Sequence, residues 1–374
     1  MMKSTAALAA LALLAACGDG QPLFDENGNP NGVTVTQAPS SGNGTTTGGT
    51  ITSNNGGTTD GPTTDGGIAT DGALPPGTVN PTNADAIFRV EPRDNDGGGL
   101  VTQASYNKRA DTFTVDNIGF DGANVYKRNT AVPTVGNARV FAADEVTEDF
   151  LTGNAIDQII PYRALYGVSP TQLDGEPRTS YAIVRTGGYV NKGFGGYIYE
   201  RNGGVKLPDS GQATFSGKYA GIRVFEGQGG LEYTDGDMRL DIDFEDFNAN
   251  DAVKGRIVNR HAYNENGVRL QTGTAETDLK LPNVFFTVQE GTPSLNADGE
   301  ISGSVSSFVP SDTGALEPFE TGTFTGIIAG DTTTGAAGSP GRGGEIVGII
   351  KMTSEDPRTE GVSVQETGGA ILTR

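Results

Sequence analysis

The chain has 374 residues and a formal net charge of −20, with 26 Lys and Arg against 46 Asp and Glu. An acidic surface of this kind repels nucleic acid, so we expect no nucleic-acid partner. A single cysteine excludes an internal disulfide, and a single histidine leaves little material for a histidine-based triad or metal cluster.

The N-terminus carries the features of a bacterial lipoprotein signal peptide over residues 1–16. Lys3 precedes a small and apolar run from Ala6 to Ala16, which is shorter than the roughly 20 residues that a bilayer span needs. The run ends in Leu14-Ala15-Ala16-Cys17, which is typical of a lipobox. We expect lipidation of Cys17; the alternatives are an uncleaved N-terminal anchor and a chance cysteine after an ordinary signal peptide.

Residues 17–85 are predicted to form a disordered linker behind the lipidated Cys17. They are poor in apolar residues and rich in Gly, Thr, Ser, Asn, Asp and Pro, with a loose repeat at 58–62 and 63–67. Such a segment cannot bury enough apolar surface to offset its conformational entropy. Its root-mean-square reach is on the order of 45 Å, enough to hold a folded body clear of the membrane.

The residue after Cys17 bears on the destination of the anchored protein. Gly18 stands where an Asp would signal retention at the inner membrane of enteric bacteria. We therefore predict a protein anchored by lipid at the outer membrane and displayed on the cell surface.

Residues 86–205 are predicted to form a smaller β-rich domain. Short runs of β-branched and aromatic residues alternate there with turn residues, which is typical of strands. The expected strands are 86–90, 112–115, 124–128, 139–141, 162–167, 180–185 and 193–200. A short helix is expected only within Asp144 to Ile160.

Residues 206–374 are predicted to form a β-barrel domain of eight or nine strands in meander order. The expected strands are 213–225, 229–233, 237–247, 253–260, 284–288, 300–305, 322–326, 345–350 and 369–372. A turn at Thr234-Asp235-Gly236 is expected to join the second and third of these into a hairpin. Closing the strands into a barrel removes the exposed edges of the sheet, and strand glycines suit its tight corners.

The strand 237–247 has the clearest pattern in the chain. Met238, Leu240, Ile242 and Phe244 alternate strictly with charged residues. This period of two predicts an antiparallel strand with one buried and one solvated face.

Several motifs of this half resemble a known family. They are Gly217-Lys218-Tyr219-Ala220-Gly221, Asp243 to Asn248 followed by Val253-Lys254-Gly255-Arg256-Ile257, Gly322 to Gly326, and Gly343 to Gly348. Together they resemble the C-terminal barrel of the transferrin-binding protein B and factor H-binding protein superfamily of surface lipoproteins. The resemblance covers 206–374 well and 86–205 loosely. It implies an all-β fold with an eight-stranded antiparallel barrel presented on the cell surface, and it implies no particular ligand.

The sequence departs from that family at one place. Ile327 to Asp331 and the glycine-rich segment that begins at Gly335 stand where the family carries an aromatic and acidic stretch. The details of binding or packing in the family are therefore not carried over to this chain.

Few residues suggest catalysis or metal binding. His261 is expected to be an exposed loop histidine. A cluster of carboxylates invites a calcium interpretation, but calcium needs six to eight oxygens from a sharply turning loop, and here they spread along a strand, which favours a solvated outer face. The cluster is Asp235, Asp237, Asp241, Asp243, Glu245, Asp246 and Asp251.

Two further segments have a functional and a structural interpretation. Gly335 to Glu345 lacks the Gly-Lys-Ser/Thr of a phosphate loop and is expected to be a hairpin loop. The tyrosines and phenylalanines at 181–199 could form a ligand surface or the core of the smaller domain.

We therefore predict a non-catalytic surface protein that captures a protein or a small solute, with iron or haem acquisition as one candidate role. No cofactor and no metal site are expected, and the chain is expected to be a monomer. The alternative is a structural or adhesive envelope lipoprotein without a soluble ligand. A glycan or lipid hydrolase ranks below both.

Overall fold

The structure is a computed structural model that describes residues 74–374, apart from 117, 119–124, 144–145, 149–151, 153–154, 158–160, 188–190, 245–252, 288–294, 312 and 334–342. The described residues form strands and no helix, so the predicted all-β class is confirmed. In particular, no described segment is a helix long and apolar enough to cross a membrane.

Cys17 and most of the predicted linker lie outside the described residues. The C-terminal end of the predicted disordered linker, residues 74–85, differs from the prediction, because it makes ordered contacts with strands. The Val90 amide donates to the Pro76 carbonyl, and the Arg201 guanidinium donates to the carbonyls of Thr82 and Asp85.

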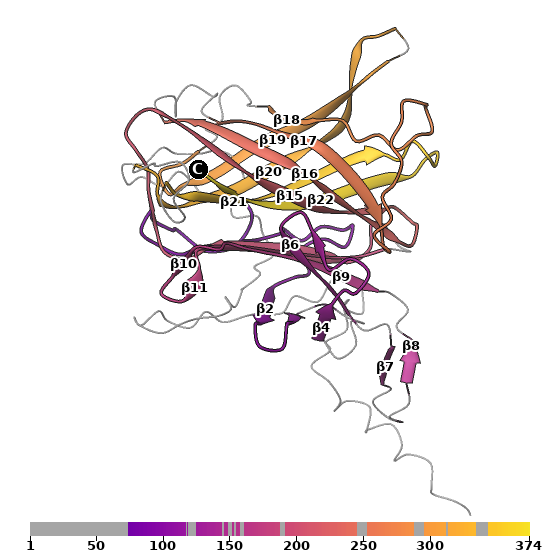
Figure 1. Cartoon of the computed structure of the whole chain (residues 1–374), viewed down its shortest axis with the longest axis horizontal. Helices are drawn as coiled ribbons and strands as arrows, with labels where there is room; N and C mark the ends of the chain where they lie inside the picture. The colour runs from indigo at the N-terminus through magenta and orange to yellow at the C-terminus, as the bar shows by residue number, and fades with distance from the viewer. Residues whose placement is uncertain are drawn as a thin grey trace, which may run out of the picture. The chain divides into compact units, whose positions relative to one another are not determined.

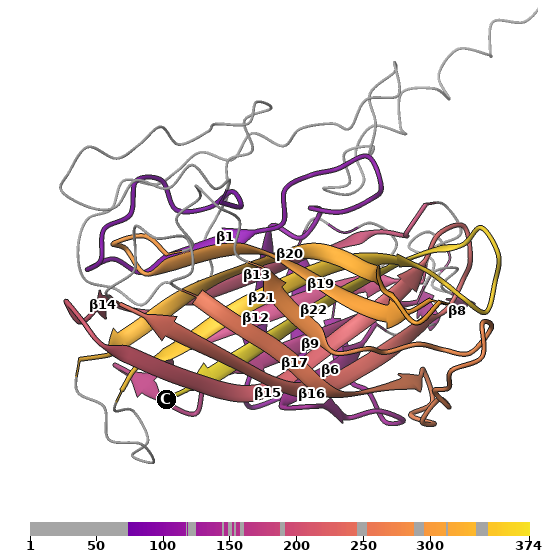
Figure 2. The ribbon, with the colours of Figure 1, turned by 90° about the horizontal axis from the view of Figure 1, so that it is seen from above.

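The C-terminal half forms the predicted eight-stranded antiparallel barrel (Figures 1 and 2). Each strand pairs with the next one in the chain, and the last pairs back onto the first, which closes the sheet. The strands are β15 Gln212–Phe225, β16 Leu231–Asp243, β17 Val253–Asn264, β18 Val284–Thr287, β19 Glu300–Pro310, β20 Leu316–Asp331, β21 Glu345–Glu355 and β22 Ser363–Thr373. A short strand, β14 Val205–Lys206, adds to β20 in parallel.

The alternation predicted for β16 is confirmed. Met238, Leu240 and Ile242 are buried in the barrel core, whereas the residues between them are more exposed. Leu240 lies opposite Phe215 of β15, which belongs to the same core. The period of two thus separates the barrel interior from its outer surface.

The turn predicted at Thr234-Asp235-Gly236 is wrong, because β16 runs without interruption from Leu231 to Asp243. The segment instead lies at a β-bulge against β17. Asp235 pairs with His261 and Asp237 with Val258, so one residue of β16 faces two of β17. Asn259 takes up the extra residue with a φ of 55°. A turn signal in the sequence therefore marks a distortion of the ladder.

Residues 87–201 form a second, nine-stranded sheet with the order β1-β13-β12-β9-β6-β4-β3-β2 and with β5 on β6. The strands are β1 Ile87–Val90, β2 Gln103–Asn107, β3 Thr112–Asp116, β4 Val125–Arg128, β5 Thr134–Val135, β6 Ala138–Ala142, β9 Tyr162–Val168, β12 Thr179–Thr186 and β13 Gly195–Arg201. A small hairpin is formed by β10 Gln172–Leu173 and β11 Glu176–Pro177. We call the nine-stranded sheet of residues 87–201 the first sheet, because it precedes the barrel in the chain.

The helix predicted within Asp144 to Ile160 is wrong. This segment holds two short strands, β7 Val146–Glu148 and β8 Ala155–Asp157, which pair with each other. Val146, Thr147 and Ile156 are β-branched residues, which favour strands over helices.

The first sheet packs one face against the outside of the barrel. Ile183 and Leu165 of the first sheet share an apolar core with Ile222, Val347 and Ile349 of the barrel. A separate core lies on the other face of the first sheet and includes Val101, Phe113, Tyr126, Phe141, Tyr162, Ala164 and Val184. The first sheet is thus buried on both faces over much of its area.

Candidate binding surface

The interior of the barrel is filled by its own aromatic side chains, which pack into gaps left by glycines. A Cβ at Gly348 or Gly326 would lie closer to the Phe324 ring than van der Waals contact allows. A Cβ at Gly368 would collide with the phenol of Tyr219. Large rings and small neighbours thus interlock across the barrel, as in a close-packed core.

A network of buried ion pairs occupies a further part of the interior. Arg260 Nη1 and Nη2 contact Glu320 at 2.6 and 2.9 Å, and Nη2 also contacts Glu366 at 2.9 Å. Arg223 Nη1 lies 2.7 Å from Glu232. Although burial would raise the pKa of Glu366, the guanidinium groups of Arg260 and Arg223 outweigh it and lower that pKa.

Hydroxyl groups complete this network. The phenol of Tyr219 and the hydroxyl of Thr234 both donate to Glu366 Oε1, at 2.8 and 2.9 Å. The Ser307 hydroxyl donates to Glu320 at 2.6 Å. Because these carboxylates are paired within the barrel, the arrangement favours a structural role over a site for a ligand.

The structure distributes the predicted carboxylate cluster along the outer face of the barrel. Asp237 accepts from Lys218 and Asn259, and Asp241 accepts from Arg239. No group of three or more His, Cys, Asp or Glu side chains that could hold a metal lies together in the described part of the chain. Glu245, Asp246 and Asp251 lie outside the described residues.

His261 differs from its prediction as a loop residue, because β17 continues to Asn264. Its Nδ1 lies 2.9 Å from Asp235 Oδ1, and the Tyr263 phenol donates to the same carboxylate at 3.1 Å. Both side chains of the His261–Asp235 pair are about one-third exposed, at 33% and 27%. The histidine therefore belongs to a surface hydrogen-bonded pair on a strand.

The tyrosines at 181–199 are core residues. Tyr181, Tyr197 and Tyr199 are buried between the first sheet and the barrel. Burial raises the pKa of Tyr181 and Tyr199 far above its ordinary value. Of the glycine-rich segment 335–345, residues 335–342 lie outside the described residues, and Glu345 is buried in β21.

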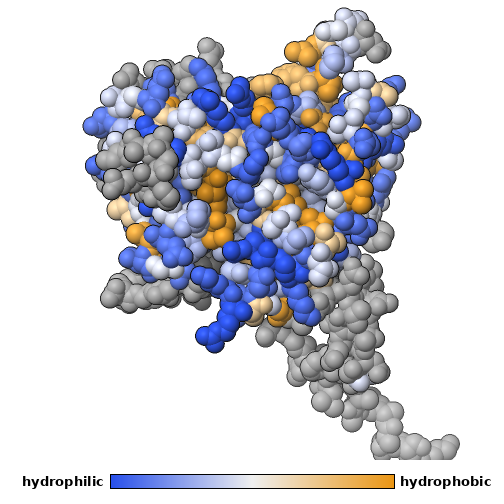
Figure 3. All heavy atoms as spheres, in the orientation of Figure 1, coloured by the Kyte–Doolittle hydropathy of each residue, from blue (hydrophilic) through white to orange (hydrophobic). Residues whose placement is uncertain are grey.

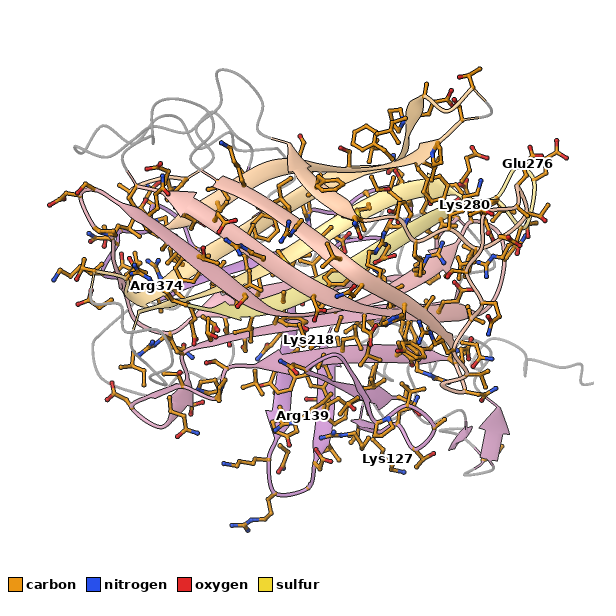
Figure 4. All side chains as sticks on the ribbon, turned by 45° about the horizontal axis from the view of Figure 1, so that its top comes forward. Lys127, Arg139, Lys218, Glu276, Lys280 and Arg374 are labelled. Carbon is orange, nitrogen blue, oxygen red and sulfur yellow. The ribbon has the colours of Figure 1, made fainter. Side chains whose placement is uncertain are left out.

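A different set of side chains, four of them half-buried and Phe141 fully buried, lies on the face of the first sheet turned away from the barrel core. Tyr106 on β2, Arg128 on β4, Arg139 and Phe141 on β6, and Tyr166 on β9 come together there, and we call them the arginine–tyrosine face. The pairing of the strands brings them together, since Arg139 lies opposite Tyr166 and Arg128 opposite Phe141. Figure 4 labels Arg139 among these strands.

The rings and guanidinium groups of this face pack against one another, with the rings tilted. The Tyr106 ring centroid lies 5.1 Å from that of Tyr166 and 5.9 Å from that of Phe141. Arg139 Cζ lies 5.1 Å from the Tyr106 centroid, and Arg128 Cζ lies 4.9 Å from the Phe141 centroid. These are favourable cation–π distances, so both arginines are held in place by the rings.

Hydrogen bonds through Asp111 fix one end of the face. The Tyr106 phenol donates to Asp111 at 2.9 Å, and Arg128 Nη2 donates to the same carboxylate at 2.7 Å. These contacts hold the pKa of Asp111 below its usual range, with the Arg128 hydrogen bond as the largest cause. The carboxylate is therefore ionised at neutral pH and balances Arg128.

Burial raises the pKa of both tyrosines of the face. That of Tyr166 rises to about 12, with the nearby charge of Glu200 as a further cause. The pKa of Tyr106 rises through burial and through its hydrogen bond to Asp111. Both phenols are therefore neutral at physiological pH, with polar hydroxyl groups beside the arginines.

Four of the five side chains of this face are half-buried. Tyr106, Arg128, Arg139 and Tyr166 each have intermediate exposure. Aromatic residues and arginine are the residue types that dominate the energetics of protein interfaces. The arginine–tyrosine face is therefore the candidate binding surface of the described residues.

A second exposed apolar feature is the hairpin between β19 and β20, where hydrophobic side chains gather in Figure 3. Leu316 is 70% exposed there and pairs with Pro310, and Pro318 pairs with Phe308. Proline cannot donate a backbone hydrogen bond, so these residues protect the hairpin edges against pairing with another chain. The hairpin carries no cation to direct a partner.

The sequence did not identify the arginine–tyrosine face. Its members come from four strands and alternate with residues of the opposite face, so no local motif joins them. Two basic dipeptides in this acidic chain could have indicated it. They are Lys108-Arg109, close to Tyr106, and Lys127-Arg128 on β4.

Comparisons with known proteins gave matches among solved structures. No family model matches the sequence, and no curated protein is similar to it in sequence. A solved transferrin-binding protein B from Haemophilus parasuis aligns with a TM-score of 0.32 and 11% identity, over 71% of this chain and 41% of that one. HpuA from Kingella denitrificans, solved in complex with human haemoglobin, aligns with a TM-score of 0.31 and 12% identity, over 79% of this chain and 90% of that one.

These similarities concern the fold alone. The chain spans 41% of the first transferrin-binding protein B structure and 52% of a second one. Transferrin-binding protein B, which the motifs of residues 206–374 resemble, is thus among the similar solved structures.

Proposed function

We propose that this chain is a lipid-anchored, non-catalytic surface protein that binds a protein ligand through the arginine–tyrosine face. The observation that carries the proposal is the position of Arg139 over the ring of Tyr106, which in turn packs against the half-exposed Tyr166. Stacked aromatic and guanidinium groups lose little conformational freedom on binding, because they are already held in position.

The packing of the barrel supports a protein ligand over a small solute. Phe324 and Tyr219 fill the interior next to Gly348 and Gly368, and the ion pairs of Arg260 occupy a further part of it. A small-molecule site is usually a concave pocket with a largely apolar lining. We therefore place binding on the outside of the fold.

Lipidation of Cys17 and a flexible linker complete the proposal, since together they would hold the folded body away from the membrane. The resemblance to the transferrin-binding protein B superfamily extends it to one candidate role, the capture of an iron- or haem-carrying protein.

The test is affinity capture from growth medium and envelope extract with the full chain in detergent. We expect a specific partner that the wild-type protein retains and that Tyr106→Ala loses. Lys218→Ala serves as a control, because Lys218 lies on the barrel strand β15. Recovery of no specific partner would favour the alternative of a structural envelope lipoprotein, and a partner retained equally by Tyr106→Ala would remove the arginine–tyrosine face from the proposal.

Display at the surface has its own test. Protease added to whole cells should cleave the protein as readily as protease added after lysis. Protection in whole cells and cleavage only after lysis would place the protein inside the envelope.

A further inference from the structure

We propose that the arginine–tyrosine face recognises a short acidic segment of its protein partner, with Arg139 as the central contact. This inference rests on the proposed function and names the chemistry of the partner.

The local balance of charge at the arginine–tyrosine face is positive. Asp111 neutralises Arg128 at 2.7 Å. Arg139 lies over the Tyr106 ring and makes no direct ion pair with a carboxylate of the described residues, although its charge also helps to lower the pKa of Asp111. Lys108 and Arg109 are exposed in the turn between β2 and β3, directly after Tyr106. Cations therefore outnumber carboxylates here, on a chain whose formal net charge is −20.

The guanidinium of Arg139 carries donor groups that suit a carboxylate. A guanidinium presents a planar set of N–H donors that matches the two oxygens of a carboxylate. The Tyr106 ring holds the half-exposed Arg139 guanidinium in place, where it can make such a contact. Partial burial also strengthens the interaction, because the surroundings are less polar than bulk water.

Negative groups next to the face limit its extent. Glu200 lies close enough to Tyr166 to raise the pKa of its phenol. Burial raises the pKa of Glu200 itself, and the Ser180 hydroxyl donates to it at 2.7 Å. The cationic area therefore runs from Arg139 toward Lys108 and Arg109, and not toward Tyr166.

The net charge of the whole molecule distinguishes between kinds of anionic partner. Nucleic acid and an anionic membrane present extended negative surfaces, which the net charge of the whole molecule repels. A short acidic peptide segment can reach the face alone, and at physiological salt it interacts mainly with charges within a Debye length of about 8 Å. The partner that fits is therefore a protein with an exposed run of Asp or Glu.

The experiment measures binding of a fluorescein-labelled oligoglutamate peptide to the full chain in detergent, by fluorescence anisotropy. We expect saturable binding that weakens with added salt, and about tenfold weaker binding by Arg139→Gln, the effect of losing one strong charge contact. The matched control is Arg269→Gln, which removes one positive charge from an exposed residue next to β17 and should leave binding unchanged. Oligolysine should not bind at this face.

Three outcomes would overturn the inference. They are no binding of oligoglutamate, equal binding by Arg139→Gln and the wild type, and stronger Arg139-dependent binding of single-stranded DNA or phosphatidylglycerol vesicles than of the peptide. A partner whose capture depends on Tyr106 but neither on Arg139 nor on salt would leave the proposed function intact and reject only the acidic segment. Circular dichroism of Arg139→Gln checks that the variant is folded.

Discussion

Arg89 and Glu300 are 211 residues apart in the chain and form a buried two-point ion pair between the first sheet and the barrel. Arg89 Nε lies 2.6 Å from Glu300 Oε1, and Nη2 lies 2.9 Å from Oε2. Both side chains are at most 3% exposed. The pair connects β1 to β19 and joins two sheets whose strands exchange no hydrogen-bonded ladder.

Removing one partner of this pair should strongly destabilise the protein. Glu300→Gln leaves the Arg89 guanidinium buried without a counter-ion, which typically costs about 3–5 kcal/mol. The free energy of unfolding in urea measures the effect. The double variant Arg89→Met with Glu300→Leu should recover much of the loss, because it buries no charge. A double variant as unstable as the sum of the single ones would contradict this account.

Adding a methyl group at Gly368 should also destabilise the barrel. A Cβ there collides with the Tyr219 phenol, which cannot easily move because it donates to Glu366. Overpacking of this kind costs about 1–3 kcal/mol.

Gly303→Ala is the matched control for this substitution. A Cβ at Gly303 of β19 would meet no atom within 4 Å. We expect its free energy of unfolding to stay within about 0.5 kcal/mol of the wild type. Equal losses at Gly368 and Gly303 would show that a general preference of the strands for glycine, and not the Tyr219 ring, sets the cost.

Glu91 should make stability depend on pH in the acid range. Burial alone would raise its pKa, but Arg185 and Lys351 outweigh burial and hold it below its ordinary value of 4.5. Because the folded-state pKa is the lower one, the pair stabilises the fold above the unfolded-state pKa, and this contribution is lost as the pH falls through the folded-state pKa. Glu91→Gln should therefore be less stable at pH 7 and lose less further stability on acidification.

Glu345 should change the pH dependence of stability in the opposite direction to Glu91. Burial raises its pKa, although hydroxyl groups of Ser169 and Thr179 donate to it at 2.8 Å. Its protonation favours the fold as the pH falls through the raised pKa, so Glu345→Gln should lose stability more steeply than the wild type on acidification. Urea unfolding at a series of pH values checks both variants, and parallel curves for the two would reject the assignment.

The predicted lipid anchor is tested by Cys17→Ser. Without the thiol there is no acceptor for a diacylglycerol group, so the variant should leave the membrane fraction and appear in the soluble fraction. Mass spectrometry of the wild-type N-terminal peptide should show the lipid mass on Cys17. Unchanged membrane association of Cys17→Ser would favour the alternative of an uncleaved apolar anchor.

The barrel could be predicted from the sequence because its strands alternate with a period of two and follow one another in space. Met238, Leu240 and Ile242 define the interior with no information from other strands. The same local pattern predicts a turn at Thr234 to Gly236, where the structure has a bulge. A bulge against β17 uses the same residue types as a turn.

The contacts between the sheets could not be predicted in this way. Nothing near Arg89 in the sequence identifies Glu300 as its partner, and Arg185 and Lys351 reach Glu91 from distant strands. The arginine–tyrosine face escaped prediction for the same reason. The rings of Tyr106 and Tyr166 lie 5.1 Å apart although β3, β4 and β6 separate their strands in the order of the sheet.

The pairing of β22 with β15 has a consequence for the time at which the protein can fold. The strand that closes the barrel is β22, Ser363–Thr373, the last of its eight strands in chain order. Until its synthesis is complete, β15 and β21 each lack a neighbour, and the first sheet lacks the surface against which Tyr181 packs at Gly369. Closure of the barrel must therefore wait until β22 has been synthesised, and a polypeptide that lacks β22 would leave both β15 and β21 without a neighbour.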